Sequence, residues 1–228
     1  MKDLPLISCL CVTHKKPDML KRAIRCFDNQ TYPNKQMVIV YEESDQPTHE
    51  FVVEQKFDTN IKIVKINTNF KMTLGELRNI SVSKADGSFV CQWDDDDWYG
   101  AYRLSKQMNH LLQHEKSASI LSRWIVFDSC SQKAYLSHTR LWEGSILCRR
   151  DLMLQNPYPP LPKAEDTCVI DSIHKNGELS IIHDMPSLYV YIIHGNNTWD
   201  HDHFKKMLSC SRELSPSNLE KVIQAISN

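Results

Sequence analysis

Hydrophobic positions in the first 91 residues alternate between two kinds of pattern. Four short apolar runs are typical of buried strands: residues 6–12, 36–41, 61–66 and 88–91. Three stretches between them suit helices: residues 17–27, 47–57 and 73–84. Pro17 opens the first helix, and a capping box of Thr73 and Glu76 opens the third. This alternation predicts βαβ units and an α/β fold with a mostly parallel, Rossmann-like central sheet flanked by helices.

The second half of the chain is less regular. Residues 102–114 predict a helix, and a further helix is expected from residues 164–166 onward. Short strands are expected near 120, 125–127, 134–136, 145–148, 179–183 and 188–193. We interpret residues 200–203, with His201 and His203, as a solvated loop in preference to a metal site. Ser217 begins a last capping box, whose helix has an apolar stripe suited to packing on the domain.

Polar residues follow three of the predicted parallel strands where each strand ends. The first strand is followed by Thr13 and His14, the second ends at Glu42-Glu43, and the fourth leads into residues 94–97. Ligands of such sheets bind at the carboxyl ends of the strands. The sequence therefore predicts a binding site along this edge.

The acidic run Asp94-Asp95-Asp96-Asp97 is the strongest chemical signal in the chain. In an extended chain, alternate side chains point the same way, so Asp94 and Asp96 would converge while Asp95 points away. Carboxylates brought together in this way suit a hard divalent cation that also carries a substrate's phosphates. An acidic turn facing water is the alternative, but the tryptophans at both ends of the run favour the cation site.

Composition narrows the range of functions. The chain has 228 residues, 41% of them hydrophobic, and a net charge of −1, which provides no general attraction for nucleic acid. No apolar stretch approaches the roughly 20 residues that span a bilayer, and the start lacks a signal-peptide pattern. Eight scattered cysteines without a Cys-x-x-Cys pair make a zinc site improbable. We expect a reduced, cytoplasmic protein.

Six motifs in order resemble those of glycosyltransferase family 2, whose members have the GT-A fold. They are residues 6–14, Gly75–Asn79, Ala85–Gly87, Trp93–Trp98, Glu165-Asp166 and His194–Trp199. The resemblance implies one domain over residues 1–215, followed by a C-terminal helix over 216–228. Within this domain, about 1–98 would bind the nucleotide sugar, and about 99–200 would form a smaller acceptor-binding subregion.

The resemblance also implies a role for each motif in an inverting sugar transfer that depends on Mn²⁺ or Mg²⁺. Asp96 and His194 would bind the metal, although a backbone-bonded histidine is an equal reading of His194. Asp166 would be the catalytic base, with Glu165 positioning it; the alternative is a carboxylate that only interacts with a helix dipole. The expected nucleotide-sugar contacts are Thr13, His14, Glu43, Lys71, Arg78, Asp94 and Asp95. Trp142 and Glu143 would contact the acceptor, with a core tryptophan as the alternative.

Some departures and absences refine the expected function. Glu42-Glu43-Ser44-Asp45 stands where the family usually has paired aspartates and Gly-Ser, which leaves the nucleotide open, although UDP is expected. The Gln-x-x-Arg-Trp motif of processive synthases is missing, so we expect single additions to a saccharide or lipid-linked acceptor. The enzyme could then work in the cytoplasm or at the inner face of the membrane.

Three other functions are weighed against this one. A nucleotidyltransferase of similar fold normally has a glycine-rich loop after the first strand, whereas residues 13–17 contain no glycine. A calcium-binding EF-hand would need glycine and glutamate where Tyr99 and Ser105 stand. An inactive homologue that only binds nucleotide sugar remains the third alternative.

Overall fold

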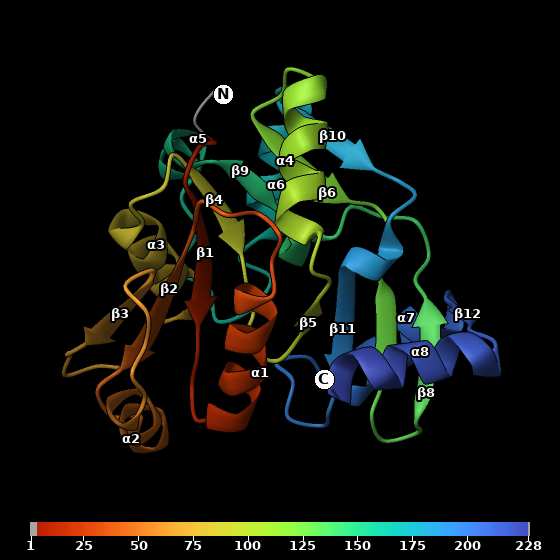
Figure 1. The fold of residues 1–228 in the computed structure, drawn as a ribbon, viewed down its shortest axis with the longest axis horizontal. Coiled ribbons are helices and arrows are strands. Elements are labelled where there is room, and N and C mark those ends of the chain that lie inside the picture. Colours follow the sequence, from red (N-terminus) through yellow and green to blue (C-terminus); the bar gives the residue numbers. More distant parts are fainter. Residues whose placement is uncertain (1–3, 228) are drawn as a thin grey trace.

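The computed structural model describes residues 4–227, which form two β-sheets and the helices that cover them (Figure 1). The larger sheet has seven strands, in the spatial order β10 (Leu179–Ile182), β6 (Ala118–Leu121), β9 (Leu147–Arg149), β4 (Phe89–Gln92), β1 (Ile7–Val12), β2 (Lys35–Glu42) and β3 (Ile61–Ile66). Strand β9 is antiparallel to its neighbours β4 and β6, whereas the other pairings are parallel. The predicted mostly parallel α/β sheet is confirmed.

The second sheet lies beside the first on the right of Figure 1. Its strands are β12 (Arg212–Glu213), β8 (Lys133–Leu136), β7 (Ile125–Asp128), β11 (Tyr189–Ile193) and β5 (Trp98–Tyr99). Strand β5 directly follows the acidic run and pairs antiparallel with β11, with Trp98 opposite Val190 and Tyr99 opposite Tyr189. The acidic run therefore connects a strand of the first sheet to a strand of the second.

Helices cover both faces of the larger sheet because its strands bury alternate residues on opposite sides. The α-helices are α1 (Pro17–Asp28), α2 (Gln46–Glu54), α3 (Leu74–Lys84), α4 (Arg103–Gln113), α5 (Arg150–Gln155), α6 (Thr167–Lys175), α7 (His201–Ser209) and α8 (Pro216–Ser227), with 3-10 turns η1 (Glu143–Ser145) and η2 (Pro186–Leu188). Cys9 and Cys11 of β1 pack in one core with α1 and α4, which lie in front of the sheet in Figure 1. Leu10 packs in the other core with α3 and α6.

Several sequence predictions are corrected by these bounds. The stretch 200–203 is no solvated loop, because α7 begins at His201 and the Asp200 side chain caps it by accepting from the backbone N–H of His203 at 2.9 Å. Helix α8 begins at Pro216, so Ser217 lies inside the helix and does not precede it. Over the described residues, no helix is both long and apolar enough to cross a bilayer.

Candidate active site

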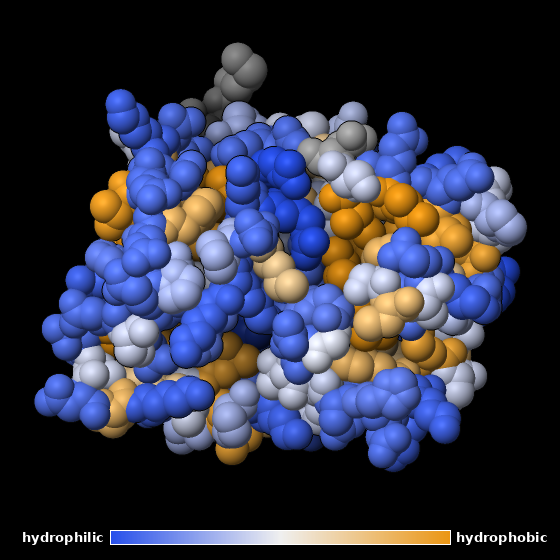
Figure 2. Space-filling view, turned by 90° about the horizontal axis from the view of Figure 1, so that it is seen from below, coloured by the Kyte–Doolittle hydropathy of each residue, from blue (hydrophilic) through white to orange (hydrophobic). Residues whose placement is uncertain are grey.

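A cleft of about 630 Å³ opens at the edge where β1, β2 and β4 end, a size typical of small-molecule sites. Figure 2 views the molecule from below Figure 1, toward this edge, and its surface is hollowed near the middle. Eleven of the predicted site residues line the cleft: Thr13, His14, Lys71, Arg78, Asp94, Asp95, Asp96, Trp142, Glu143, Glu165 and Asp166. His194 lies beside it, in hydrogen-bond contact with Asp96.

Glu43 is the predicted contact that the fold does not bring into the cleft. Its side chain is exposed and pairs with Lys65 at 2.8 Å, and it is not among the described residues that line the cleft. The preceding residue, Glu42, is buried and lines the cleft instead, where it accepts a hydrogen bond from the backbone N–H of Met72 at 3.1 Å. Glu42 therefore takes the place that the sequence reading gave to Glu43.

The four aspartates face four different partners because the chain turns after Gln92 and does not stay extended. Asp94 accepts from Arg78 at 3.0 Å. Asp95 accepts from the Thr13 hydroxyl at 2.7 Å, and Asp96 accepts from the Lys16 ammonium at 2.6 Å.

The predicted alternation, with Asp95 facing away from Asp96, is wrong. Lys16 Nζ also lies 3.7 Å from Asp95 Oδ1, so the two carboxylates share one cation. Arg78 thus contacts Asp94, Thr13 contacts Asp95, and Lys16 bridges Asp95 and Asp96.

The fourth aspartate joins the acidic run to the second sheet. Asp97 is fully buried, and its carboxylate accepts from the backbone N–H of Ile192 at 3.0 Å and from the Tyr189 hydroxyl. Burial, together with the charges of Asp96 and Asp94, raises the pKa of Asp97 well above its usual range. These contacts give Asp97 a structural role that sequence reasoning did not assign.

The pKa values of the two aspartates that contact Lys16 shift in opposite directions. Burial and the neighbouring Asp96 charge raise the pKa of Asp95 to about 7, although Lys16 and Thr13 oppose the shift. Burial acts in the same direction on Asp96, but hydrogen bonds and attraction from His194 and Lys16 outweigh it and lower the pKa of Asp96 below its usual range. Asp96 is therefore the carboxylate of this pair that stays ionised at neutral pH.

Arg78 links the acidic run to the downstream Glu165-Asp166 pair. Its guanidinium donates to Glu165 Oε1 at 2.6 Å as well as to Asp94, and it lies 5.9 Å from the centre of the Tyr158 ring. The Arg78 side chain is buried. Because its partners are protein carboxylates, Arg78 positions acidic groups in this structure.

Asp166 precedes the first residue of α6 and lines the cleft, but its side chain makes no capping hydrogen bond to the described residues of that helix. Burial raises the pKa of Asp166 to about 7, against the opposing charge of Arg78. Burial therefore outweighs the attraction of Arg78, which favours the ionised form. A carboxylate with a pKa near neutrality is well suited to accept a proton.

Part of the cleft lining is an aromatic wall, formed by Trp142, Tyr191, Trp199 and His203. Trp142 stacks on Trp124 with ring centres 4.3 Å apart and meets Tyr191 edge-on at 5.3 Å. Trp199 and His203 stack at 4.2 Å and also line the cleft. Sequence reasoning identified Trp142, and Trp199 within its motif, but missed Trp124 and Tyr191 as their neighbours because these rings come from separate segments.

Glu143, the other predicted acceptor contact, pairs with an arginine beside the aromatic wall. Both of its carboxylate oxygens accept from Arg140 Nη2, one of them at 2.7 Å. Lys163 adds a second positive charge beside Arg140 at the cleft, and its ammonium lies 4.9 Å from the centre of the Trp199 ring. This end of the cleft offers aromatic faces together with charged hydrogen-bonding groups.

The donor atoms of the cleft include one pair suited to a divalent cation. Within residues 4–227, no three His, Cys, Asp or Glu side chains cluster closely enough to hold a metal by themselves. Asp96 Oδ2 and His194 Nε2 are 3.1 Å apart, close to the roughly 3 Å between adjacent ligands of a six-coordinate ion with bonds near 2.1 Å. The two side chains thus fit a site that substrate phosphates would complete.

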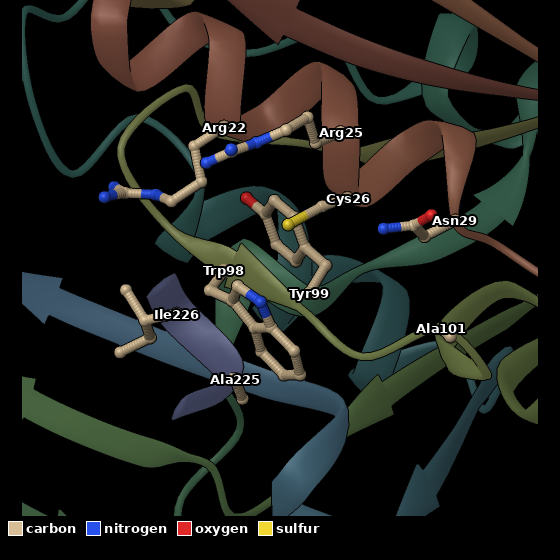
Figure 3. Close-up of a pocket in the computed structure, with 9 residues that line it drawn as sticks. All are labelled: Arg22, Arg25, Cys26, Asn29, Trp98, Tyr99, Ala101, Ala225 and Ile226. Atoms are coloured by element: carbon tan, nitrogen blue, oxygen red, sulfur yellow. The ribbon is translucent and has the colours of Figure 1, made fainter. Parts of the chain in front are cut away.

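A second, smaller cavity of about 240 Å³ lies between α1, β5 and α8 (Figure 3). Arg22 and Arg25 of α1 line it together with Trp98 and Tyr99, and Ile226 lies on the opposite side. None of the described residues that line this cavity is acidic. The chemistry described above is therefore confined to the larger cleft.

Comparison with known families agrees with the motifs. The family described as "Glycosyl transferase family 2" matches residues 8–169, which contain both the acidic run and the Glu165-Asp166 pair. The chain belongs to glycosyltransferase family 2. An uncharacterized glycosyltransferase of Methanocaldococcus jannaschii is 26% identical over 126 residues, which are 55% of this chain and 43% of that protein. The matching stretches cover between 40% and 48% of the curated relatives.

Solved structures of glycosyltransferases share the GT-A fold of this family 2 chain. S. aureus TarS 1–349 in complex with UDP-GlcNAc has a TM-score of 0.68 at 16% identity, covering 96% of this chain and 65% of that one. The mannosyltransferase PcManGT of Pyrobaculum calidifontis, in complex with GDP-Man and Mn²⁺, has a TM-score of 0.66 at 14% identity, with coverages of 92% and 63%.

Proposed function

We propose that this chain is a metal-dependent inverting glycosyltransferase that moves one sugar from a nucleotide-diphosphate sugar, with UDP as the expected nucleotide, to a hydroxyl of a saccharide or lipid-linked acceptor. The observation that carries the proposal is the joining of two acidic groups in one cleft by Arg78. One group, Asp94 to Asp96, suits a donor diphosphate and its cation, and the other contains Asp166, a carboxylate with a pKa near neutrality. The GDP-Man and Mn²⁺ complex of PcManGT supports the donor class and the cation.

Asp96 and His194 would hold the divalent cation, which when bound supplies positive charge that stabilises the diphosphate leaving group. Asp95 stays in place through Thr13, and Asp94 through Arg78. Thr13 and His14 follow β1 at the same edge and line the cleft where the nucleotide would lie. Lys71 would add a charge for the diphosphate from the segment before α3.

Asp166 would take the proton of the acceptor hydroxyl as its oxygen attacks the anomeric carbon. The bond from that carbon to the diphosphate oxygen breaks at the same time, and its electron pair leaves with the nucleotide. Attack from the face opposite the leaving group inverts the anomeric centre. Glu165, fixed by Arg78, would keep the Asp166 segment in position, and the aromatic wall with Trp142 and Glu143 would hold the acceptor.

A two-stage experiment tests the proposal. Calorimetry with UDP, GDP and dTDP, first in chelator and then with Mn²⁺, should show that the preferred nucleotide binds much more tightly with Mn²⁺, and Asp96→Ala should remove this gain. The matching nucleotide sugars are then screened for nucleotide release with candidate saccharide acceptors. Binding of equal strength in chelator and in Mn²⁺ would contradict the metal dependence. Donor binding without transfer to any acceptor would favour the inactive homologue.

A further inference from the structure

Lys16 lies directly before α1, and its ammonium reaches across to the acidic run. Its Nζ atom lies 2.6 Å from Asp96 Oδ2 and 3.7 Å from Asp95 Oδ1. His194 Nε2 contacts the same Asp96 oxygen at 3.1 Å. The oxygen that would bind the divalent cation in the proposed function is thus already paired with a protein cation.

A divalent cation on Asp96 Oδ2 and an ammonium at its present distance from that oxygen would repel each other at very short range. An ammonium that stays on this oxygen therefore weakens the binding of the metal there. We propose that Lys16 competes with the metal: it neutralises Asp95 and Asp96 until donor and metal bind, and it then moves to the donor diphosphate. This inference rests on the proposed function and deepens it.

The structure provides the means for such a movement. A lysine side chain is a flexible four-carbon stem that carries a point charge, so its ammonium can change partners at small cost. Lys16 lines the same cleft as the groups that would bind the diphosphate. The acidic run does not depend on Lys16 for its position, because the guanidinium of Arg22 donates to the main-chain carbonyl of Asp96, and Asp97 is anchored by Ile192.

The competition has opposite consequences for the two ligands. Without nucleotide, Lys16 weakens metal binding because the metal must displace it. When the metal is bound, Lys16 strengthens the binding of the nucleotide, because its ammonium pairs with phosphate oxygens that would otherwise face only the metal. Metal and donor would then bind cooperatively, and the cleft would take up little metal on its own.

The test uses Lys16→Met, which keeps the length of the side chain and removes its charge, with Lys21→Met as the matched control. Lys21 is an exposed lysine of α1, the helix that follows Lys16, so its replacement changes the net charge equally. Free Mn²⁺ is measured by electron paramagnetic resonance without nucleotide, and UDP binding in saturating Mn²⁺ by calorimetry. Lys16→Met should bind Mn²⁺ about tenfold more tightly or better than the wild type. It should bind UDP about tenfold more weakly, and Lys21→Met should match the wild type in both assays.

Two results would overturn the inference while leaving the proposed function intact. One is Mn²⁺ binding to Lys16→Met that is no tighter than to the wild type, which would mean that Lys16 does not compete. The other is unchanged UDP affinity, which would mean that Lys16 does not move to the diphosphate. Failure of the proposed function differs from both, because UDP would then bind the wild type equally well in chelator and in Mn²⁺, and Asp96→Ala would change nothing.

Discussion

Replacing Arg78 with methionine should destabilise the protein more than any loss of a surface ion pair. The side chain of Arg78 is only 10% exposed and that of its partner Glu165 only 2%, with 2.6 Å between donor and acceptor. Removing one member of a buried pair leaves an uncompensated charge, which costs about 3–5 kcal/mol. The second partner, Asp94, is 28% exposed, so water can replace much of what it loses. We therefore expect the free energy of unfolding to fall by about 3–5 kcal/mol, mainly because the Glu165 charge is left buried without a partner.

Urea unfolding followed by tryptophan fluorescence measures this loss. The matched control is Arg149→Met, which breaks an arginine–aspartate pair with Asp151 in which both side chains are more than half exposed, and it should cost less than about 1 kcal/mol. Adding Glu165→Gln to Arg78→Met should recover much of the stability, because the stranded charge is removed. Equal losses for the two arginine variants, or a double variant as unstable as the sum of its single changes, would refute the reasoning.

Four other predictions concern Asp166, Arg103 and the segment that follows β11. Turnover should rise with pH through about 7, because Asp166 must be deprotonated to act as a base, and Arg78→Met should shift this pH profile to higher pH because Arg78 lowers the pKa of Asp166. Asp166→Asn should reduce turnover ~10²–10⁴-fold and leave donor affinity unchanged. Near-normal turnover of this variant would place the base elsewhere. Arg103→Met should lower the free energy of unfolding by about 2–4 kcal/mol in urea titrations, because buried carbonyl groups that accept from Arg103 lose their donor; a loss below that of a surface substitution would contradict this. Hydrogen exchange across residues 194–200 should slow when UDP and Mn²⁺ bind, since His194 would bind the metal; unchanged exchange there, with protection at residues 94–97, would rule out ordering of this segment.

Local sequence patterns were sufficient to predict much of the fold. The first four strands and three helices follow from periodicity because each element buries one recognisable set of apolar residues. Strands β5 and β12 have two residues each and α5 has six, too few for any period to show. Helix α7 was missed because its first turn, with His201 and His203, is polar. Its capping residue Asp200 and the apolar pair Phe204 and Met207 were the signals that could have revealed it.

The site was predictable as a set of residue types but not as a set of contacts. The acidic run and Glu165-Asp166 were found through their motifs, yet Arg78 and Glu165 are 87 residues apart, and nothing local indicates that they pair. Lys16 was overlooked for the same reason, since 80 residues separate it from Asp96. The choice between Glu42 and Glu43 depended on which neighbour faces inward at the end of β2, and a shift of one residue reverses that orientation.

The contact between Asp97 and β11 limits how relatives of this chain could be recombined. A chimera joined at residue 98, intended to pair this donor half with a foreign acceptor half, would separate Asp97 from the Ile192 amide and the Tyr189 hydroxyl that satisfy it. It would also replace His194, which directly follows β11 and contacts Asp96. A viable exchange must therefore take the acidic run and β11 with His194 from the same parent. Acceptor preference is therefore better engineered by substitutions in the aromatic wall than by transplanting whole segments.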